Sequence, residues 1–163
     1  MKTNANKKDL ISEGDRAPVF TLPGAGLEKI SLSKFKGKKV VLYFYPKDDT
    51  SGCTKESIEF NELKDKFARA GTLVIGMSPD PVAKHVKFQE KYKLSQPLAS
   101  DESKETLLAY GVWIEKSMYG RKYMGVERST FLIDEKGKIA KIWRKVKVPG
   151  HAAEVLAAAK ALS

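Results

Sequence analysis

Cysteine and histidine are scarce in this chain, which has one cysteine and two histidines among its 163 residues. A single cysteine excludes an intramolecular disulfide bond and a cysteine-rich zinc site. The two histidines, His85 and His151, lie far apart in the sequence and form no metal-binding motif with each other. We therefore expect no metal and no cofactor. Cys53 is then either an inert buried thiol or a reactive one.

The surroundings of the two histidines argue against a cysteine hydrolase, which would require a histidine base beside Cys53. His85 lies among lysines in a segment with a polar helical face, and His151 opens the last, alanine-rich helical segment. We expect both histidines to lie at the surface or at helix ends.

Long hydrophobic runs are also missing. The longest is Val40–Tyr45, far shorter than the roughly 20 apolar residues that a membrane-spanning helix requires. The first nine residues, Met1–Asp9, are rich in lysine and asparagine, and no apolar segment follows them. This pattern argues against a secretory signal. We expect a cytoplasmic protein without a membrane partner.

Acidic residues are outnumbered by basic ones, 20 to 30, which leaves a net charge of +10. Such a charge can attract polyanions. The basic residues are spread along the whole chain, however, and the densest stretch, Lys136–Lys147, alternates with apolar residues like a strand with one solvated face. A nucleic-acid-binding module would need aromatic and basic residues on one exposed face, whereas most aromatics here fall at core positions. We expect no specific nucleic-acid partner.

The length and the absence of low-complexity tracts suit one α/β domain over residues 13–163, preceded by a flexible segment of residues 1–12. The apolar run Val40–Tyr45 favours a central strand buried on both faces, and the glycine-rich residues 23–26 favour a hairpin turn. The predicted strands are Val19–Leu22, Lys29–Leu32, Val40–Tyr45, Thr72–Met77, Arg128–Asp134 and Lys138–Val146, and the predicted helices are Cys53 to the residue before Gly71, Val82–Tyr92, Lys104–Tyr110 and Ala152–Leu162.

The loop between the central strand and the first helix carries the chemistry. Free backbone N–H groups gather at a helix N-terminus and carry a partial positive charge. A cysteine at that position is stabilised as the thiolate, which is the nucleophilic form. Gly52 allows a close approach of the backbone, and the Thr50 hydroxyl can reach back toward the sulfur or an oxygen beside it. Pro46 begins the loop and shields the thiolate from water. Each of these residues also has an ordinary interpretation as a cap or a terminator; the combination points to a reactive Cys53.

This combination resembles a known family. Pro46, Thr50 and Cys53 match Pro-x-x-x-Thr/Ser-x-x-Cys, the active-site motif of the peroxiredoxins, and the string from Tyr43 to Glu56 is similar to the PrxQ subgroup, also called bacterioferritin comigratory protein. Further similar blocks follow in the same order along the chain: 13–22, 76–80, 110–113, 118–120, 123–134 and 143–151. The resemblance implies a thioredoxin-like fold, with a central mixed β-sheet flanked by helices and an N-terminal β-hairpin.

The resemblance also implies a thiol peroxidase and supplies one more active-site residue, Arg128. Its guanidinium is permanently charged and offers several donors, so it can hold the thiolate and the peroxide oxygens together. The expected reaction is reduction of hydrogen peroxide or organic hydroperoxides, with Cys53 oxidised to a sulfenic acid. Glu56 is a supporting candidate that either orients the arginine or stabilises the first turn of its helix.

The chain departs from its subgroup in lacking a second cysteine. Many members have a resolving cysteine five residues after the first, where this chain has Ile58, and others have it in the next helix, Val82–Tyr92, which contains none. The sequence therefore predicts a one-cysteine variant recycled by an external thiol, either thioredoxin or glutathione with glutaredoxin. Resemblance to the subgroup implies a monomer. Ser51 also replaces a proline that is common in the subgroup.

Two other functions compete with this prediction. A thiol–disulfide oxidoreductase of the thioredoxin type would need Cys-x-x-Cys at the helix start, but Glu56 occupies the second position. A redox-sensing or holdase-like binding protein would use the sulfenic acid of Cys53 as a signal with little turnover. Peroxide turnover with an added reductant distinguishes that alternative from a peroxidase.

Overall fold

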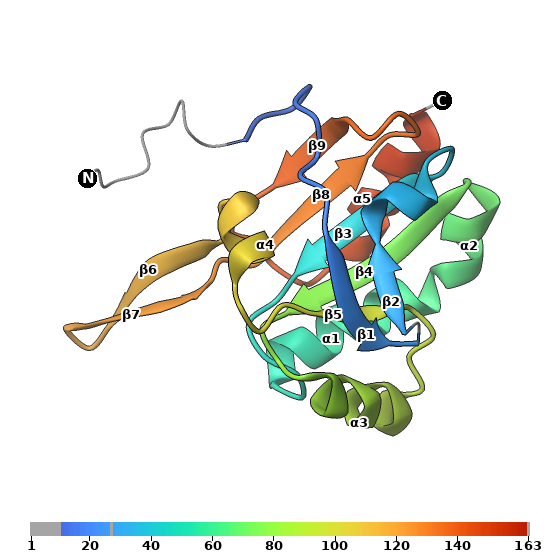
Figure 1. The fold of residues 1–163 in the computed structure, drawn as a ribbon. Coiled ribbons are helices and arrows are strands. Elements are labelled where there is room, and N and C mark those ends of the chain that lie inside the picture. Colours follow the sequence, from blue (N-terminus) through green and yellow to red (C-terminus); the bar gives the residue numbers. More distant parts are fainter. Residues whose placement is uncertain (1–10, 27, 163) are drawn as a thin grey trace.

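The computed structural model describes residues 11–26 and 28–162. Within them, a mixed seven-stranded sheet has the strand order β2-β1-β5-β4-β3-β8-β9 (Figure 1). Its strands are β1 (Thr21–Ala25), β2 (Lys29–Ser31), β3 (Lys39–Phe44), β4 (Thr72–Ser78), β5 (Leu98–Ser100), β8 (Ser129–Ile133) and β9 (Ile139–Trp143). Residues 1–10 of the segment predicted to be flexible lie outside the described residues.

Strand β3 is the centre of this sheet. It pairs in parallel with β4 and antiparallel with β8. All six of its residues are buried, as expected of a strand covered on both faces. Its first residue, Lys39, is buried because its ammonium donates to the carbonyls of Ala159 and Leu162 at the end of the last helix, where a positive charge is favourable.

Helices lie on both faces of the sheet. One face is covered by α1 (Ser51–Glu62), α2 (Lys64–Arg69), α3 (Val82–Tyr92) and α5 (His151–Ala161), which share a buried core with Tyr43 of β3. The other face carries α4 (Glu105–Ala109), the short 3₁₀-helix η2 (Leu32–Phe35) and a second core around Leu42 and Ile75. This arrangement, with helices α1 and α5 packed together behind the sheet, is visible in Figure 1.

The helix predicted from Cys53 to Gly71 is two helices. The first ends at Glu62, because the N–H of Leu63 turns back to the carbonyl of Phe60, and the second starts at Lys64. The sequence pattern could not reveal this break, because Phe60 and Phe67 bury the same face on either side of it. Gly71, which has a φ of +66°, ends the second helix as predicted.

The N-terminal hairpin is confirmed: the pairing of β1 with β2 ends at Pro23 and Lys29, so the predicted glycine-rich residues 24–26 lie in the connection, where Gly26 has a φ of +92°. Residues Pro23 to Ala25 belong to β1, which pairs with both β2 and β5. A Cβ at Gly24 would overlap the side chain of Ile30 and the carbonyl of Leu98. The glycine is therefore required by the close approach of neighbouring strands, which local turn signals do not report.

Three strands were not predicted. Strand β5 is only three residues long, and β6 (Trp113–Met118) and β7 (Arg121–Val126) form a separate antiparallel hairpin. Much of this hairpin is exposed, so it lacks the apolar alternation of a half-buried strand. Its turn residues, Tyr119 and Gly120, both have positive φ, as in the primed turns that suit two-residue hairpin loops.

In the described part of the chain, no helix has the length and the apolar character needed to cross a membrane.

His151 begins α5 but, contrary to the prediction of a surface position, its ring is buried. A hydrogen bond of 2.7 Å joins its Nε2 to the hydroxyl of Thr130, and the rings of Phe60 and Trp143 pack edge-on against it. Burial is the main cause that lowers the pKa of His151 to about 4. Glu154 raises this pKa and Arg128 lowers it, both to a smaller extent. The folded protein therefore keeps His151 neutral over the whole physiological range.

This burial predicts acid sensitivity. Between the ordinary histidine pKa of 6.5 and the folded value of about 4, the unfolded chain gains a proton that the folded chain does not, so stability falls as pH falls. Between pH 7.5 and 4.5, the unfolding free energy of the wild-type protein should fall by about 2 to 3 kcal/mol more than that of the His151→Gln variant. Urea unfolding of both proteins at these two pH values measures the difference. A difference that stays constant with pH would contradict a neutral buried imidazole.

Candidate active site

Cys53 lies in the first turn of α1, immediately after the loop that leaves β3. The strand ends at Phe44, the helix begins at Ser51, and the first backbone bond into the helix runs from the N–H of Thr54 to the carbonyl of Thr50. The N–H of Cys53 precedes that bond and points toward the helix N-terminus, where partial positive charge accumulates. The residue is 1% exposed. Its sulfur is therefore held in a protected position with a favourable local field.

Arg128 is brought to this sulfur by strand pairing. It directly precedes β8, and Ser129 at the start of β8 pairs with Phe44 at the end of β3. Its Nη2 donates to the Cys53 Sγ at 3.3 Å, and its Nη1 donates to Glu56 Oε1 at 2.7 Å. The guanidinium thus bridges the thiol and a carboxylate from the same helix turn, a geometry that suits its planar fork of donors.

Glu56 is buried beneath this bridge, with 1% of its surface exposed. Burial raises its pKa to about 7 in spite of the opposing effect of Arg128. Its second oxygen, Oε2, has no hydrogen-bond partner in the described part of the chain. Desolvation without full hydrogen bonding explains why the neutral form is favoured. The carboxyl group consequently changes charge near neutral pH, beside the arginine that contacts the thiol.

Gly52 makes room for the guanidinium. A Cβ at this position would lie 3.2 Å from the Nη2 of Arg128, closer than most real contacts of a Cβ. Any side chain here would press on the nitrogen that contacts Cys53. The structure thus brings together four of the residues singled out in the sequence: Arg128 contacts Cys53 and Glu56, and Gly52 leaves the space that its guanidinium occupies.

Thr50 and Pro46 lie in the loop that precedes the helix. The Thr50 hydroxyl donates to the carbonyl of Lys47 at 2.8 Å, and its side chain is exposed. Pro46 is half-buried at the start of the loop. The proton of the Thr50 hydroxyl is therefore already engaged, which leaves its oxygen to accept a hydrogen bond from an approaching molecule.

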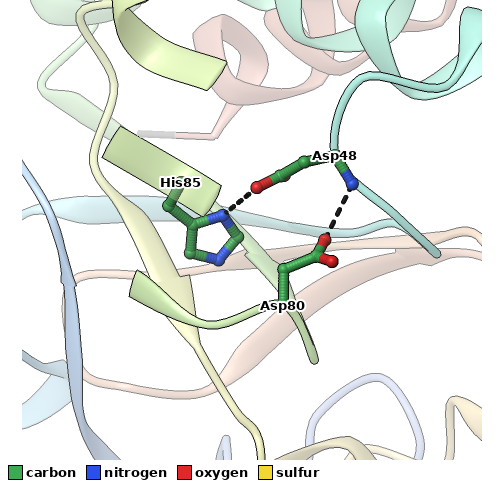
Figure 2. A group of neighbouring side chains, drawn as sticks. All are labelled: Asp48, Asp80 and His85. Atoms are coloured by element: carbon green, nitrogen blue, oxygen red, sulfur yellow. Dashed lines mark hydrogen bonds and ion pairs between the residues drawn. The ribbon is translucent and has the colours of Figure 1, made fainter. Parts of the chain in front are cut away.

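A second polar cluster, which the sequence did not predict, holds the same loop from the other side. Figure 2 shows Asp48 of the loop, Asp80 after β4 and His85 of α3 pointing toward one another. Asp48 Oδ2 lies 2.6 Å from His85 Nδ1, and the N–H of Asp48 donates to Asp80 Oδ2 at 2.7 Å. The hydroxyl of Tyr45 donates to the other oxygen of Asp48. The loop is thus tied to both β4 and α3.

His85 is fully buried, so its predicted surface position is wrong. Its Nε2 lies 3.0 Å from the carbonyl of Ala99, and its Nδ1 faces the Asp48 carboxylate. Both ring nitrogens therefore face an oxygen that can accept a hydrogen bond. A signal for burial was present: Phe88, three residues later, shares its helix face, and it is buried as well.

The composition of this cluster, one imidazole and two carboxylates, is also that of a metal site. The polar atoms are already committed, however. Asp80 Oδ2 accepts from the hydroxyl of Ser78 at 2.8 Å in addition to the N–H of Asp48, and Asp80 Oδ1 lies 3.4 Å from Lys84 Nζ. With both nitrogens of His85 bonded as well, we interpret the cluster as a buried hydrogen-bond network that positions the loop.

Comparison with known proteins identifies the family. A sequence model of the AhpC/TSA family matches residues 13–142. Peroxiredoxin Bcp of Bacillus subtilis is 47% identical over 153 residues, which cover 94% of this chain and 98% of the relative. Peroxiredoxin Q of Xanthomonas campestris has a TM-score of 0.84 at 44% identity, covering 87% of this chain and 90% of that one. A PrxQ variant from Xylella fastidiosa has a TM-score of 0.88 at 41% identity, covering 93% and 96%.

The chain is a peroxiredoxin of the PrxQ subfamily. Peroxiredoxins are thiol-dependent peroxidases, so the predicted enzyme class and the thioredoxin-like fold are both confirmed. Serine variants of two different cysteines were solved for the Xanthomonas campestris protein, so that relative has at least two cysteines. This chain has one, in agreement with the predicted one-cysteine variant.

Proposed function

We propose that Cys53 is the peroxidatic nucleophile and reduces hydrogen peroxide and organic hydroperoxides. One observation carries this proposal: the guanidinium of Arg128 contacts the Cys53 sulfur while its other arm is held by Glu56. A thiol that is simply packed in a core has no reason to face a charged donor. Alkyl peroxide reduction is an activity of the Xanthomonas campestris bacterioferritin comigratory protein, whose structure resembles that of this chain. That relative supports organic hydroperoxides as substrates.

In the proposed reaction, the Cys53 thiolate attacks the terminal oxygen of the hydroperoxide. A sulfur–oxygen bond forms, the oxygen–oxygen bond breaks, and the leaving oxygen takes up a proton to become water or an alcohol. Arg128 and the backbone N–H of Cys53 stabilise the charge that develops on the leaving oxygen, and they require no reorganisation during the step. The Thr50 oxygen accepts the hydrogen bond of the incoming hydroperoxide, and Pro46 and Gly52 shape the loop around it.

The product on the enzyme is a Cys53 sulfenic acid, which the chain has no second cysteine to resolve. We infer that an external thiol attacks it, releasing water and forming a mixed disulfide, and that a second thiol then restores Cys53. Thioredoxin, or glutathione with glutaredoxin, is the proposed reductant. The protein needs no cofactor or metal in this cycle, and we propose that it acts as a monomer in the cytoplasm.

The test is oxidation of Cys53 by hydroperoxide in the full chain, followed by stopped-flow fluorescence of Trp113 and Trp143 and by mass spectrometry. We expect a rate far above that of a free thiol, a mass increase of one oxygen, and recycling by thioredoxin or by glutaredoxin with glutathione. Cys53→Ser is the control and should not react. Rapid oxidation without recycling by either reductant would favour the redox-sensing or holdase-like alternative, and a rate no higher than that of a free thiol would overturn the peroxidase proposal.

A further inference from the structure

The β6–β7 hairpin extends from the body of the molecule (Figure 1). Strand β7 ends at Val126, two residues before Arg128. In this hairpin Lys116 pairs with Tyr123, and Ser117 pairs with Lys122. Adjacent pairs in a ladder face opposite sides. Lys116 and Lys122 therefore lie on opposite faces of the same hairpin.

Lys116 leans toward the root of the hairpin. A Cβ at Gly125 would lie 3.3 Å from the Cδ and 3.6 Å from the Cε of Lys116, so the lysine stem passes over the glycine. Tyr123 is the residue opposite Lys116 in the hairpin. Along the chain, Gly125 lies closer to Arg128 than Tyr123 does. The side chain is half-buried, and its ammonium is directed toward the end of the hairpin that carries the active-site arginine.

The charges that act on Lys116 include two from the active site. Burial and the neighbouring Arg128 lower its pKa, whereas Glu127 and the Cys53 thiolate raise it. The carboxylate of Glu127 lies 3.6 Å from the guanidinium of Arg144. Within the described part of the chain, the Lys116 ammonium has no hydrogen-bond or ion-pair partner of its own. Its three donors are therefore open to a bound molecule.

We propose that Lys116 is a specificity-determining residue of the peroxidase site that binds the anionic group of a hydroperoxide carrying a carboxylate near its oxygen–oxygen bond. This inference rests on the proposed role of Cys53. Two of the five N–H donors of Arg128 are engaged by Glu56 and the sulfur, and in the proposed reaction its guanidinium also stabilises the leaving oxygen of the peroxide. Lys116 adds a second positive charge on the hairpin that leads into Arg128, with its stem over Gly125, so an anionic substrate group is attracted there without disturbing the bridge.

The experiment compares two tertiary alkyl hydroperoxides that differ by a single carboxylate group, neutral tert-butyl hydroperoxide and anionic β-hydroperoxyisovalerate. Rate constants for Cys53 oxidation are measured by stopped flow in wild type, Lys116→Met and Lys116→Arg. The ratio of the anionic to the neutral rate constant should fall about fivefold in Lys116→Met and be retained in Lys116→Arg. It should also decrease in the wild type as salt is raised, because the ammonium is partly exposed.

Lys122→Met is the matched control, because it removes the same charge from an exposed position on the opposite face; its ratio should equal that of the wild type. Gly125→Ala is a second variant that displaces the Lys116 stem without changing the charge and should lower the ratio. The inference would be overturned if Lys116→Met left the ratio unchanged, including the case in which it lowered both rate constants by the same factor. A wild-type protein that fails to reduce neutral tert-butyl hydroperoxide would contradict the proposed function itself. That result is distinct from a failure of the Lys116 inference, which concerns only the ratio.

Discussion

Replacing Arg128 with methionine is expected to slow the oxidation of Cys53 by hydrogen peroxide by about a hundredfold to a thousandfold. This is the usual cost of removing one preorganised donor from a developing negative charge. Arg128 contacts the sulfur at 3.3 Å, so its loss removes stabilisation from both the thiolate and the leaving oxygen. Stopped-flow measurement of the second-order rate constant with purified, reduced protein tests the expectation.

Two further variants separate charge from geometry. Arg128→Lys keeps the positive charge but not the fork that reaches both Cys53 and Glu56, so it should recover only a small part of the rate. Arg121→Met removes an exposed arginine from the β6–β7 hairpin and should leave the rate within about twofold of the wild type. A rate for Arg128→Met close to that of wild type would remove the arginine from the mechanism.

Replacing His85 with leucine is expected to lower the free energy of unfolding by about 3 to 5 kcal/mol, because it leaves a buried carboxylate without its partner. The imidazole is fully buried and lies 2.6 Å from Asp48. For a chain of this length, such a loss corresponds to a decrease of roughly 10 °C in the melting temperature. Urea unfolding and calorimetry at neutral pH measure the effect.

Lys84→Met is the matched control for this variant. Lys84 also lies close to Asp80, at 3.4 Å, but its side chain is 42% exposed. Removing an exposed ion-pair partner should lower the free energy of unfolding by no more than about 1 kcal/mol. A double-mutant cycle with Asp48→Asn then isolates the pair, and the two changes should be far from additive. If His85→Leu lowered the free energy of unfolding as little as Lys84→Met does, the buried network would not be what holds the loop.

Much of the fold followed from local pattern. The apolar run at the centre of the chain became β3, and the helix predicted over Val82–Tyr92 has those bounds. The strand follows from a continuous apolar run and the helix from the spacing of its apolar residues, and a sequence displays both directly. The hairpin β6–β7 was missed for the complementary reason. Its strands are largely exposed, and an exposed strand has no apolar alternation to detect.

The active site likewise contains residues that the local sequence reveals and one residue that it does not. The loop around Cys53 was evident from residues close together in the sequence, because the motif spans a single strand-to-helix junction. Arg128 came only from resemblance to the family. Nothing in its own neighbourhood distinguishes it from other basic residues, and its contact with Cys53 depends on the pairing of β8 with β3.

The sequence by itself determined the candidate nucleophile, the one-cysteine character and the alternation of strands and helices, because each depends on residue type or on short-range spacing. Only the tertiary structure decided that His85 is buried beside two carboxylates and that Lys116 leans toward the active site. Both side chains are basic and have lysine or glutamate beside them in the sequence, which favours a solvent-exposed position, and for His85 only the shared helix face with Phe88 points the other way. Their actual surroundings come from elements distant in the chain, and hydrogen bonds to the Asp48 carboxylate and the Ala99 carbonyl make the burial of His85 tolerable.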